Sequence, residues 1–526
     1  MPEGIFFAHP QWNNWIEIFL RGVNQRSVDE YTAELAESGF PCGVHVMDGF
    51  WMSHQGSYAF HAPDFPDPKG MFARMRENEW VPLVWTAHFV SPDSREYKRL
   101  RYHEKLGGLD YLAYRAKPGS REAAVVRWWS GISAVYDLTK PEAADFYAKT
   151  LRDFAEEYGV AGFKFDAGDP RFFAEDCRFH DEAAEPVDYA RLYAELAARE
   201  FPYHEIRTSW KCGGLPLVTR LNDRAHAWSG PNGQDTVVPQ IVAAGLLGCP
   251  YSVADMVGGG LDASFVGGKI DEKLFVRSAA LQSLMPMMQF SPAPWRHLTP
   301  EGVRLCRKFA DLHMEFAPYI LETARHAAMT GEPIVRAMEY EFPHQGFNRP
   351  MQQFMLGSRW LVAPVVTPDD AKTVELPAGT WRDDLGETHV GPKTLRLANV
   401  PLDRLPRYER ISGKEDNVPR DFGLSRWDSP KGLSNIWMLM FCPTNDFAKN
   451  VWARPKDATN FRREKLEDGD RFVWSGFKIR KHRLALTELI LYFVERYDGS
   501  FGFSSCGSVL TGTSFSFAAG GTLGTT

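Results

Sequence analysis

Cysteine is scarce in this sequence and shows no pairing pattern. The seven cysteines are scattered and odd in number, and no two of them form the C-x-x-C spacing of zinc sites and redox motifs. We therefore expect free thiols, as in a reducing compartment, and neither a disulfide framework nor a zinc site.

A long apolar run is also missing. The longest ones, such as residues 484–494, are too short and too interrupted to span a bilayer. Residues 1–10 lack the basic segment and apolar stretch of a signal peptide. The sequence therefore predicts a cytoplasmic protein that has no membrane partner.

Positive charge is in deficit, with 60 Lys and Arg against 67 Asp and Glu. Nucleic-acid-binding proteins carry a basic surface, so no nucleic-acid partner is expected. Aromatic residues, by contrast, make up 13% of the chain and include 16 Trp. Sugar-binding clefts use aromatic faces, but large cores use them as well, so this abundance is only a hint.

Strands and helices alternate over residues 1–330. The first strand is expected near Ile16–Leu20, and the central one is Gly162–Phe165, which follows a helix over Pro141–Tyr158. Ser27 and Glu30 have the spacing of a capping box at the start of a helix that ends before Gly39. Eight such strand–helix units without a glycine-rich phosphate loop predict a (β/α)8 barrel rather than a doubly wound sheet.

Other segments depart from this strand–helix alternation. Residues 91–134 form an insertion in the barrel, and residues 301–329 are expected to be two helices beside it. Short strands over residues 331–410 predict a small β-sandwich. Residues 411–526 show no clear period, so the sequence assigns this tail neither structure nor function.

The functional residues are expected at one end of the barrel, because the carboxyl ends of its strands meet there. The side chains at these strand ends are Asp48, Trp85, His88, Asp166, Arg207, Asp223 and Asp255. His88 is the exception, since chemistry that uses carboxylates needs no imidazole, and we expect it to be structural.

Two carboxylates on opposite sides of a glycosidic bond can act as nucleophile and proton donor. Asp166 and Asp223 are separated by two further strand–helix units, so both can reach the same mouth. Lys164 lies on the same side of its strand as Asp166 and would keep that carboxylate ionised, although a salt bridge inside the barrel is an alternative role. Asp235 and Asp255 are rival acids, and Asp235 fits a helix N-cap better.

Several separated motifs resemble glycoside hydrolase family 31, and within it a branch that contains an α-galactosidase. The similarity extends from about Pro10 to Arg410, and its motifs are FKFDAG at 163–168, RWW at 127–129, LND at 221–223, LGCPY at 247–251, DMVGG at 255–259 and MPMMQFSPAPWR at 285–296.

The resemblance implies a retaining exo-acting α-glycosidase that uses no metal and no organic cofactor. Asp166 falls on the family's nucleophile and Asp223 on its general acid/base. The positions that line the pocket for the terminal sugar correspond to Asp48, Trp85, Trp129, Lys164, Arg207 and Asp255. Trp128 is the alternative to Trp129, because adjacent tryptophans on a strand cannot both face the pocket.

The Lys-x-Asp motif is shared with α-galactosidases, and the W-x-D-M-N-E motif of the family's α-glucosidases is missing. The expected substrate is therefore an α-galactoside, carried by a glycoside or oligosaccharide, with an α-glucosidase, another α-hexosidase or a transglycosidase as the alternative. The oligomeric state is not predicted.

The sequence departs from the family in three ways. Asp169 stands where the similar branch has Glu, the usual N-terminal β-sandwich is missing, and the tail replaces a second C-terminal sandwich. An inactive sugar-binding barrel therefore stays open as an alternative. A metal-dependent barrel hydrolase or lyase is less favoured, because no His-x-His spacing accompanies the acids.

Overall fold

The computed structural model describes residues 1–101, 108–116, 122–267 and 270–412, together with the backbone of several strands between residues 436 and 525. The chain divides into two compact units, Met1–Ile411 and Ser412–Thr526.

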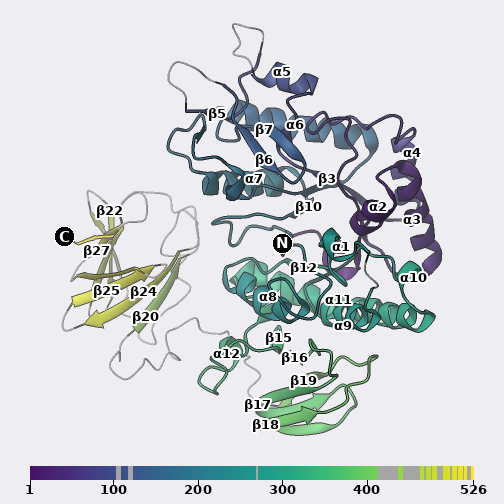
Figure 1. Cartoon of the computed structure of the whole chain (residues 1–526). Coiled ribbons are helices and arrows are strands. Elements are labelled where there is room, and N and C mark those ends of the chain that lie inside the picture. The colour runs from purple at the N-terminus through teal and green to yellow at the C-terminus, as the bar shows by residue number, and fades with distance from the viewer. Residues whose placement is uncertain are drawn as a thin grey trace. The chain divides into compact units, whose positions relative to one another are not determined.

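Eight parallel strands close into a barrel, as the sequence predicts (Figure 1). Their order around the barrel is β1-β13-β12-β11-β10-β8-β3-β2. Each strand is short and its residues are largely buried, because helices cover the outside and side chains fill the inside. The strands are β1 (Gln11–Asn13), β2 (Val44–Met47), β3 (Val81–Thr86), β8 (Gly162–Phe165), β10 (Tyr203–Ile206), β11 (Thr219–Arg220), β12 (Ser252–Met256) and β13 (Met287–Phe290).

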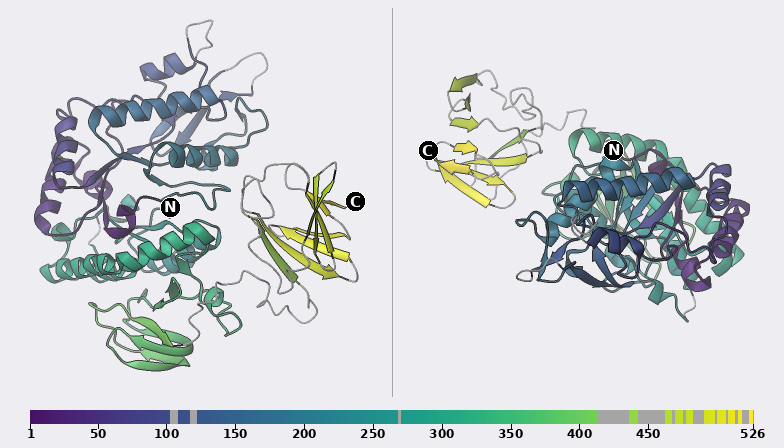
Figure 2. Two further views of the ribbon diagram at one scale, coloured as in Figure 1. Left: turned by 180° about the vertical axis from the view of Figure 1, so that it is seen from behind. Right: turned by 90° about the horizontal axis from the view of Figure 1, so that it is seen from above.

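Helices lie around these strands in both views of Figure 2. They are α1 (Ile5–Ala8), α2 (Trp15–Arg21), α3 (Gln25–Ser38), α4 (Pro68–Glu77), α5 (Arg95–Arg101), α6 (Pro141–Tyr158), α7 (Pro186–Glu200), α8 (Val237–Leu246), α9 (Glu272–Ser283), α10 (Pro294–His297) and α11 (Pro300–Thr330). On β8, Phe163 packs against Phe154 of α6, and Phe165 packs against Tyr193 of α7. Alternation along the strand therefore turns Lys164 to the inside of the barrel.

Gly162 opens β8 at a point where two strands are in close contact. A Cβ atom added there would lie 1.7 Å from the carbonyl oxygen of Tyr203, its partner residue on β10. Gly162→Ala is therefore expected to push the strands apart and to lower the free energy of unfolding by about 3 kcal/mol or more. Urea denaturation measures this loss. Gly4→Ala is the control, because its added Cβ would meet nothing closer than 3.6 Å; equal stability of the two variants would contradict the expectation.

Three local predictions are wrong. Residues Ile16–Leu20 belong to α2, and the first strand is the polar segment Gln11–Asn13, which is too short to show alternation. Helix α3 begins earlier than predicted, because Asn24 caps it by accepting the N–H of Ser27. Residues Pro300–Thr330 form one helix instead of two, since buried side chains on both sides of Pro318 keep one face packed.

The predicted barrel insertion contributes strands to two small antiparallel sheets, one in the order β4-β7-β6 and the other β5-β9. The strands are β4 (Phe89–Val90), which precedes the insertion, β5 (Tyr114–Arg115), β6 (Val125–Trp128), β7 (Gly131–Val135) and β9 (Cys177–Arg178), which follows β8. Residues 102–107 and 117–121 of the insertion lie outside the described part of the chain.

The predicted small β domain is an antiparallel sheet in the order β14-β15-β16-β19-β17-β18. It consists of β14 (Val335–Arg336), β15 (Phe354–Leu356), β16 (Trp360–Val362), β17 (Lys372–Asp383), β18 (Thr388–Leu397) and β19 (Arg407–Ser412). The buried Arg277 of α9 ties this domain to the barrel by donating to the carbonyls of Val400, Pro401 and Arg404.

The tail, to which the sequence assigned no structure, contains strands in two sheets. One sheet has the order β20-β24-β25-β26 and the other β21-β22-β23-β27-β28. The strands are β20 (Ile436–Phe441), β21 (Arg462–Leu466), β22 (Gly469–Trp474), β23 (Phe477–Lys481), β24 (Ile490–Tyr497), β25 (Ser500–Ser505), β26 (Ser508–Gly512), β27 (Phe515–Phe517) and β28 (Leu523–Thr525).

The structure bears on the predictions of free thiols and of no membrane-spanning segment. Cys42, Cys177, Cys212, Cys249 and Cys306 carry free thiols, whereas Cys442 and Cys506 lie outside the described residues. Within the described ranges, no helix is both long enough and apolar enough to cross a bilayer.

Candidate active site

Asp166 lies directly after β8, at the carboxyl end of the barrel. Its Oδ2 accepts a hydrogen bond of 2.8 Å from Trp85 Nε1, and its Oδ1 accepts one of 2.9 Å from the backbone N–H of Ala167. Ala167 has a positive φ of 60°, which is uncommon for alanine and is the kind of backbone strain found at functional sites. Both oxygens are therefore held in one orientation.

The surroundings of Asp166 keep its carboxylate ionised. Burial alone would raise its pKa, but Arg207, Lys164 and Arg220 outweigh burial and hold the pKa below its ordinary value. The nearest of these contacts is Arg207 Nη1, at 3.7 Å from Oδ1. An oriented, ionised carboxylate is suited to nucleophilic attack.

Lys164 forms the salt bridge that the sequence left open as an alternative. Its Nζ lies 2.6 Å from Asp48 Oδ2, and both side chains are almost fully buried. Burial would lower the pKa of Lys164, but Asp48, Glu205 and Asp166 together outweigh burial, and the pKa is raised. Lys164 also lowers the pKa of Asp166, so the two roles considered for it coexist.

Arg207 follows β10 and lies between three carboxylates. Its Nη1 donates to Asp223 Oδ2 at 2.9 Å and faces Asp166, while its Nε lies 3.4 Å from Asp169 Oδ2. Its guanidinium stacks over the ring of Trp129 at 5.3 Å. Asp166 and Asp223 thus flank one guanidinium nitrogen.

Trp129 and Trp128 divide their roles. Trp129 is 45% exposed and packs on Arg207 and Phe172 at the rim of the site. Trp128 is buried and stacks on Trp85, with ring planes 6° apart. Trp129 is therefore the tryptophan of this pair that has a face available to a ligand.

Asp255 lies in a different environment from the other predicted residues. It is fully buried and has a left-handed backbone with φ 72°. Its Oδ2 accepts the backbone N–H of Arg224 at 2.7 Å, and its Oδ1 accepts from Arg220 at 2.9 Å. Burial raises the pKa of Asp255 to about 6, although Arg220 opposes this effect.

Asp223, the predicted acid/base, is partly exposed, with 34% of its side chain accessible. Burial favours its neutral form, but Arg220, Arg207 and Lys164 dominate and hold its pKa far below the ordinary value. Asp235, its other rival, caps no helix through its side chain, since the N-cap of α8 is Thr236. The prediction of an Asp235 N-cap is therefore wrong.

The side chains predicted at the strand ends gather at the mouth of the barrel, apart from His88. Trp85, Asp166, Arg207 and Asp223 are joined by hydrogen bonds and ion pairs, and Arg220 links Asp223 to Asp255. The ion pair of Lys164 with Asp48 acts on Asp166 through the charge of Lys164. His88 is fully buried against the rings of Phe89, Tyr189 and Tyr193, and burial lowers its pKa to about 3. A neutral packing role fits the structural expectation for this histidine.

Two residues of the network were missed by the sequence analysis. Arg220 on β11 contacts Asp223, Asp255 and Glu205, and Glu205 on β10 accepts from Gln289. Arg220 stands three residues before Asp223, so its position at a strand end was the signal that could have revealed it. Glu205 lies inside the barrel, and no local pattern marks it.

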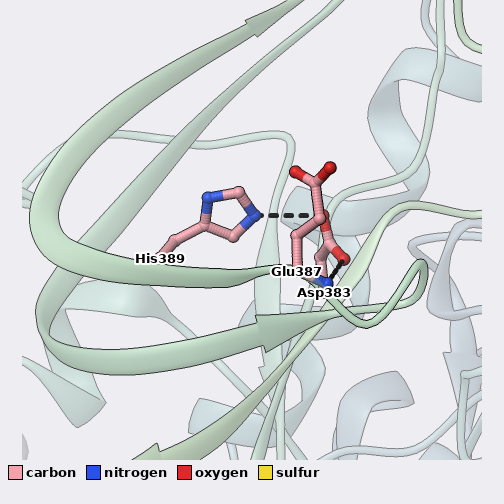
Figure 3. A group of neighbouring side chains, drawn as sticks. All are labelled: Asp383, Glu387 and His389. Atoms are coloured by element: carbon pink, nitrogen blue, oxygen red, sulfur yellow. Dashed lines mark hydrogen bonds and ion pairs between the residues drawn. The ribbon is translucent and has the colours of Figure 1, made fainter.

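A possible metal-binding group lies away from this network. Within the described residues, Asp383, Glu387 and His389 are the side chains whose ligand atoms come within 4.8 Å of one another (Figure 3). Asp383 accepts from the backbone N–H groups of Leu385 and Glu387 and pairs with His389 Nε2 at 3.0 Å. These contacts belong to the turn that joins β17 to β18, which explains why the three side chains lie together.

A closed parallel barrel that holds two carboxylates at the carboxyl ends of its strands is suited to glycoside hydrolysis. Residues 9–323 match the model of the glycosyl hydrolases family 31 TIM-barrel domain, and residues 331–411 match that of the family 31 C-terminal domain. The chain therefore belongs to glycoside hydrolase family 31.

The names of the relatives point to different substrates. The chain is 31% identical over 411 residues to the myogenesis-regulating glycosidase of Mus musculus, covering 77% of this chain and 56% of that protein. It is 29% identical over 407 residues to the 1,3-alpha-isomaltosidase of Kribbella flavida, covering 70% and 53%. The chain thus spans about half the length of these curated relatives.

Solved structures show the same fold. A cycloalternan-degrading enzyme from Trueperella pyogenes, in complex with a covalent intermediate, has a TM-score of 0.65 at 23% identity and covers 78% of this chain and 61% of that chain. A dextranase from Flavobacterium johnsoniae, complexed with glucose, has a TM-score of 0.66 at 17% identity and covers 96% and 61%.

Proposed function

We propose that this protein is a retaining exo-acting α-glycosidase that releases a terminal α-linked hexose, preferentially from α-galactosides. The observation that carries the proposal is Asp166, whose two oxygens are oriented by Trp85 and by the N–H of Ala167 beside a cationic group. Asp223 lies across Arg207 from it and is the partner carboxyl that a double displacement needs.

In the first step, Asp166 attacks the anomeric carbon while the bond to the leaving oxygen breaks. Asp223 gives its proton to that oxygen, so the aglycone departs as a neutral alcohol and a glycosyl ester forms on Asp166. In the second step, Asp223 takes a proton from water as the water oxygen attacks the anomeric carbon. Asp166 is released and Asp223 is protonated again, so the cycle balances.

Lys164 supports an α-galactoside as the preferred substrate. One of its N–H groups meets Asp48, and its Lys-x-Asp spacing places it beside the nucleophile, where it can donate to a sugar hydroxyl. Trp129 offers an exposed face at the rim, which suits a sugar ring. Because relatives include isomaltosidases, α-glucosidases and α-xylosidases, an α-glucoside or α-xyloside is the second candidate substrate.

The test is nitrophenol release from p-nitrophenyl α-galactoside, α-glucoside, α-xyloside and α-N-acetylgalactosaminide. We expect the galactoside to be hydrolysed fastest and the first product, seen by NMR, to be the α-anomer. EDTA should leave the rate unchanged, because the proposed steps use carboxylates alone.

Faster hydrolysis of another glycoside in the panel would support the proposed reaction but change the preferred substrate. An inverted product would contradict the role of Asp166 as a nucleophile. No release from a folded, monodisperse protein would exclude the exo-glycosidase, and sugar binding without turnover would then identify an inactive sugar-binding barrel.

A further inference from the structure

Arg220 lies at the centre of the carboxylates inside the barrel mouth. Its side chain is 1% exposed, and a single nitrogen, Nη1, lies 2.8 Å from Asp223 Oδ1 and 2.9 Å from Asp255 Oδ1. Because both acceptor oxygens bind the same nitrogen, Arg220 bridges the two carboxylates. Arg220 cannot reach a substrate without a rearrangement, so any role in catalysis passes through the carboxylates around it, which are these two and Asp166 at 4.0 Å from its Nη2.

A second set of buried polar groups holds Arg220 in place. Its Nε lies 3.1 Å from Glu205 Oε1, and the other oxygen of Glu205 accepts from Gln289 Nε2 at 2.7 Å. Gln289 in turn donates to Gln11 on the neighbouring strand β1. Burying such a network is costly compared with apolar packing, which points to a role beyond stability.

The charges around Arg220 do not balance if every acid is ionised. The cations are Lys164, Arg207 and Arg220, with Arg171 beside Asp169 and Arg224 beside Asp255, and the carboxylates, one more in number, are Asp48, Asp166, Asp169, Glu205, Asp223 and Asp255. An excess of buried negative charge favours retention of a proton by one of the acids.

Asp255 is the acid best placed to retain that proton. It is fully buried, and the charged groups that face it are Arg220, Arg224, Asp223 and Lys164, together with the backbone N–H of Arg224. Asp223, by contrast, is partly exposed and also meets Arg207. The acid that must donate a proton in the reaction therefore stands beside the acid that holds one.

We infer that Arg220 is a positioning residue that joins Asp223 and Asp255 into a pair sharing one proton, and that Glu205 fixes Arg220 for this task. At rest the proton is on Asp255. Its transfer to Asp223 leaves Asp255 ionised and changes neither the number of protons nor the net charge. Asp223 then carries the proton that it gives to the glycosidic oxygen, so the kinetic consequence rests on the proposed function.

Glu205→Gln tests the pair with little change in shape. Without the charge of Glu205, the positive charge of Arg220 acts more fully on Asp223 and Asp255, and their ionised forms become more stable. The pair then loses its proton at lower pH. We expect the basic limb of kcat/KM against pH to move down by about one pH unit.

Two further variants separate positioning from stability. Arg220→Lys keeps the charge but has a single nitrogen, so it cannot contact Glu205 and the two acids at separate nitrogens as Arg220 does, and kcat should fall about 10-fold or more with little change in KM. Glu332→Gln is the matched control, because Glu332 is a buried carboxylate paired with Arg336 outside the barrel mouth. Its basic limb should coincide with that of the unaltered protein.

Infrared spectroscopy of the unliganded protein provides a readout that needs no turnover. At pH 5 we expect the carbonyl band of a buried protonated carboxyl. Asp255→Asn should remove this band, and in Glu205→Gln the band should disappear at a lower pH than in the unaltered protein. If no glycoside is hydrolysed, the proposed function fails while this band still tests the pair. Persistence of the band in Asp255→Asn would overturn the inference. So would a basic limb of the kcat/KM profile that lies at the same pH in Glu205→Gln as in Glu332→Gln.

Discussion

Asp166→Asn is expected to lower kcat for an aryl α-glycoside by about 10⁴-fold or more while the protein stays folded. The amide has the shape of the carboxylate and can still accept from Trp85, but it cannot form the glycosyl ester. Nitrophenol release measures the activity, and the urea midpoint shows that the fold is retained. Asp153→Asn is the control, because Asp153 is an exposed acid on α6 that pairs with Lys149.

The covalent step can also be observed directly. A glycosyl fluoride with a second fluorine on the ring slows the hydrolysis of the ester and should leave a sugar on the peptide that contains Asp166. Asp166→Asn should show no such mass increase. Full activity of Asp166→Asn, or a label on another acid, would assign the nucleophile elsewhere.

Asp223→Asn is expected to show a loss that depends on the leaving group. For a methyl α-glycoside, whose leaving group needs a proton, kcat/KM should fall by about 10²- to 10⁴-fold. For a dinitrophenyl α-glycoside, which departs unaided, the first step should be nearly unchanged. Added azide should then restore turnover, since it attacks the glycosyl ester without needing a general base.

Asp255→Asn provides the comparison that identifies the acid. If Asp223 is the donor, its variant shows the leaving-group dependence and loses the basic limb of the pH profile. The same dependence in Asp255→Asn alone would instead make Asp255 the donor, with Asp223 as its partner. An equal loss for both leaving groups in Asp223→Asn would show that Asp223 only positions the substrate.

Much of the site could be predicted from local pattern. Asp48, Asp166 and Asp255 each end a buried strand, and parallel strands of a barrel bring such ends together. Lys164 could be assigned to the barrel interior because Phe163 and Phe165 alternate with it. The short strand β1 could not be placed in this way, since three residues do not show a period.

The partners of these residues could not be predicted. Arg220 and Glu205 come from neighbouring strands, and their contact depends on the register of β10 and β11. Nothing in the residues around Glu205 indicates that Gln289, which lies at the end of the barrel sequence, donates to it.

The sequence by itself determined the alternation of strands and helices, and with it the end of the barrel at which the acids lie. The tertiary structure alone decided which cation meets which acid. Asp166 and Asp223 are held ionised and Asp255 retains a proton more readily, although all three are aspartates at strand ends. The physical reason is that proton affinity depends on burial and on distances to charges from other strands, and neither is present in a local pattern.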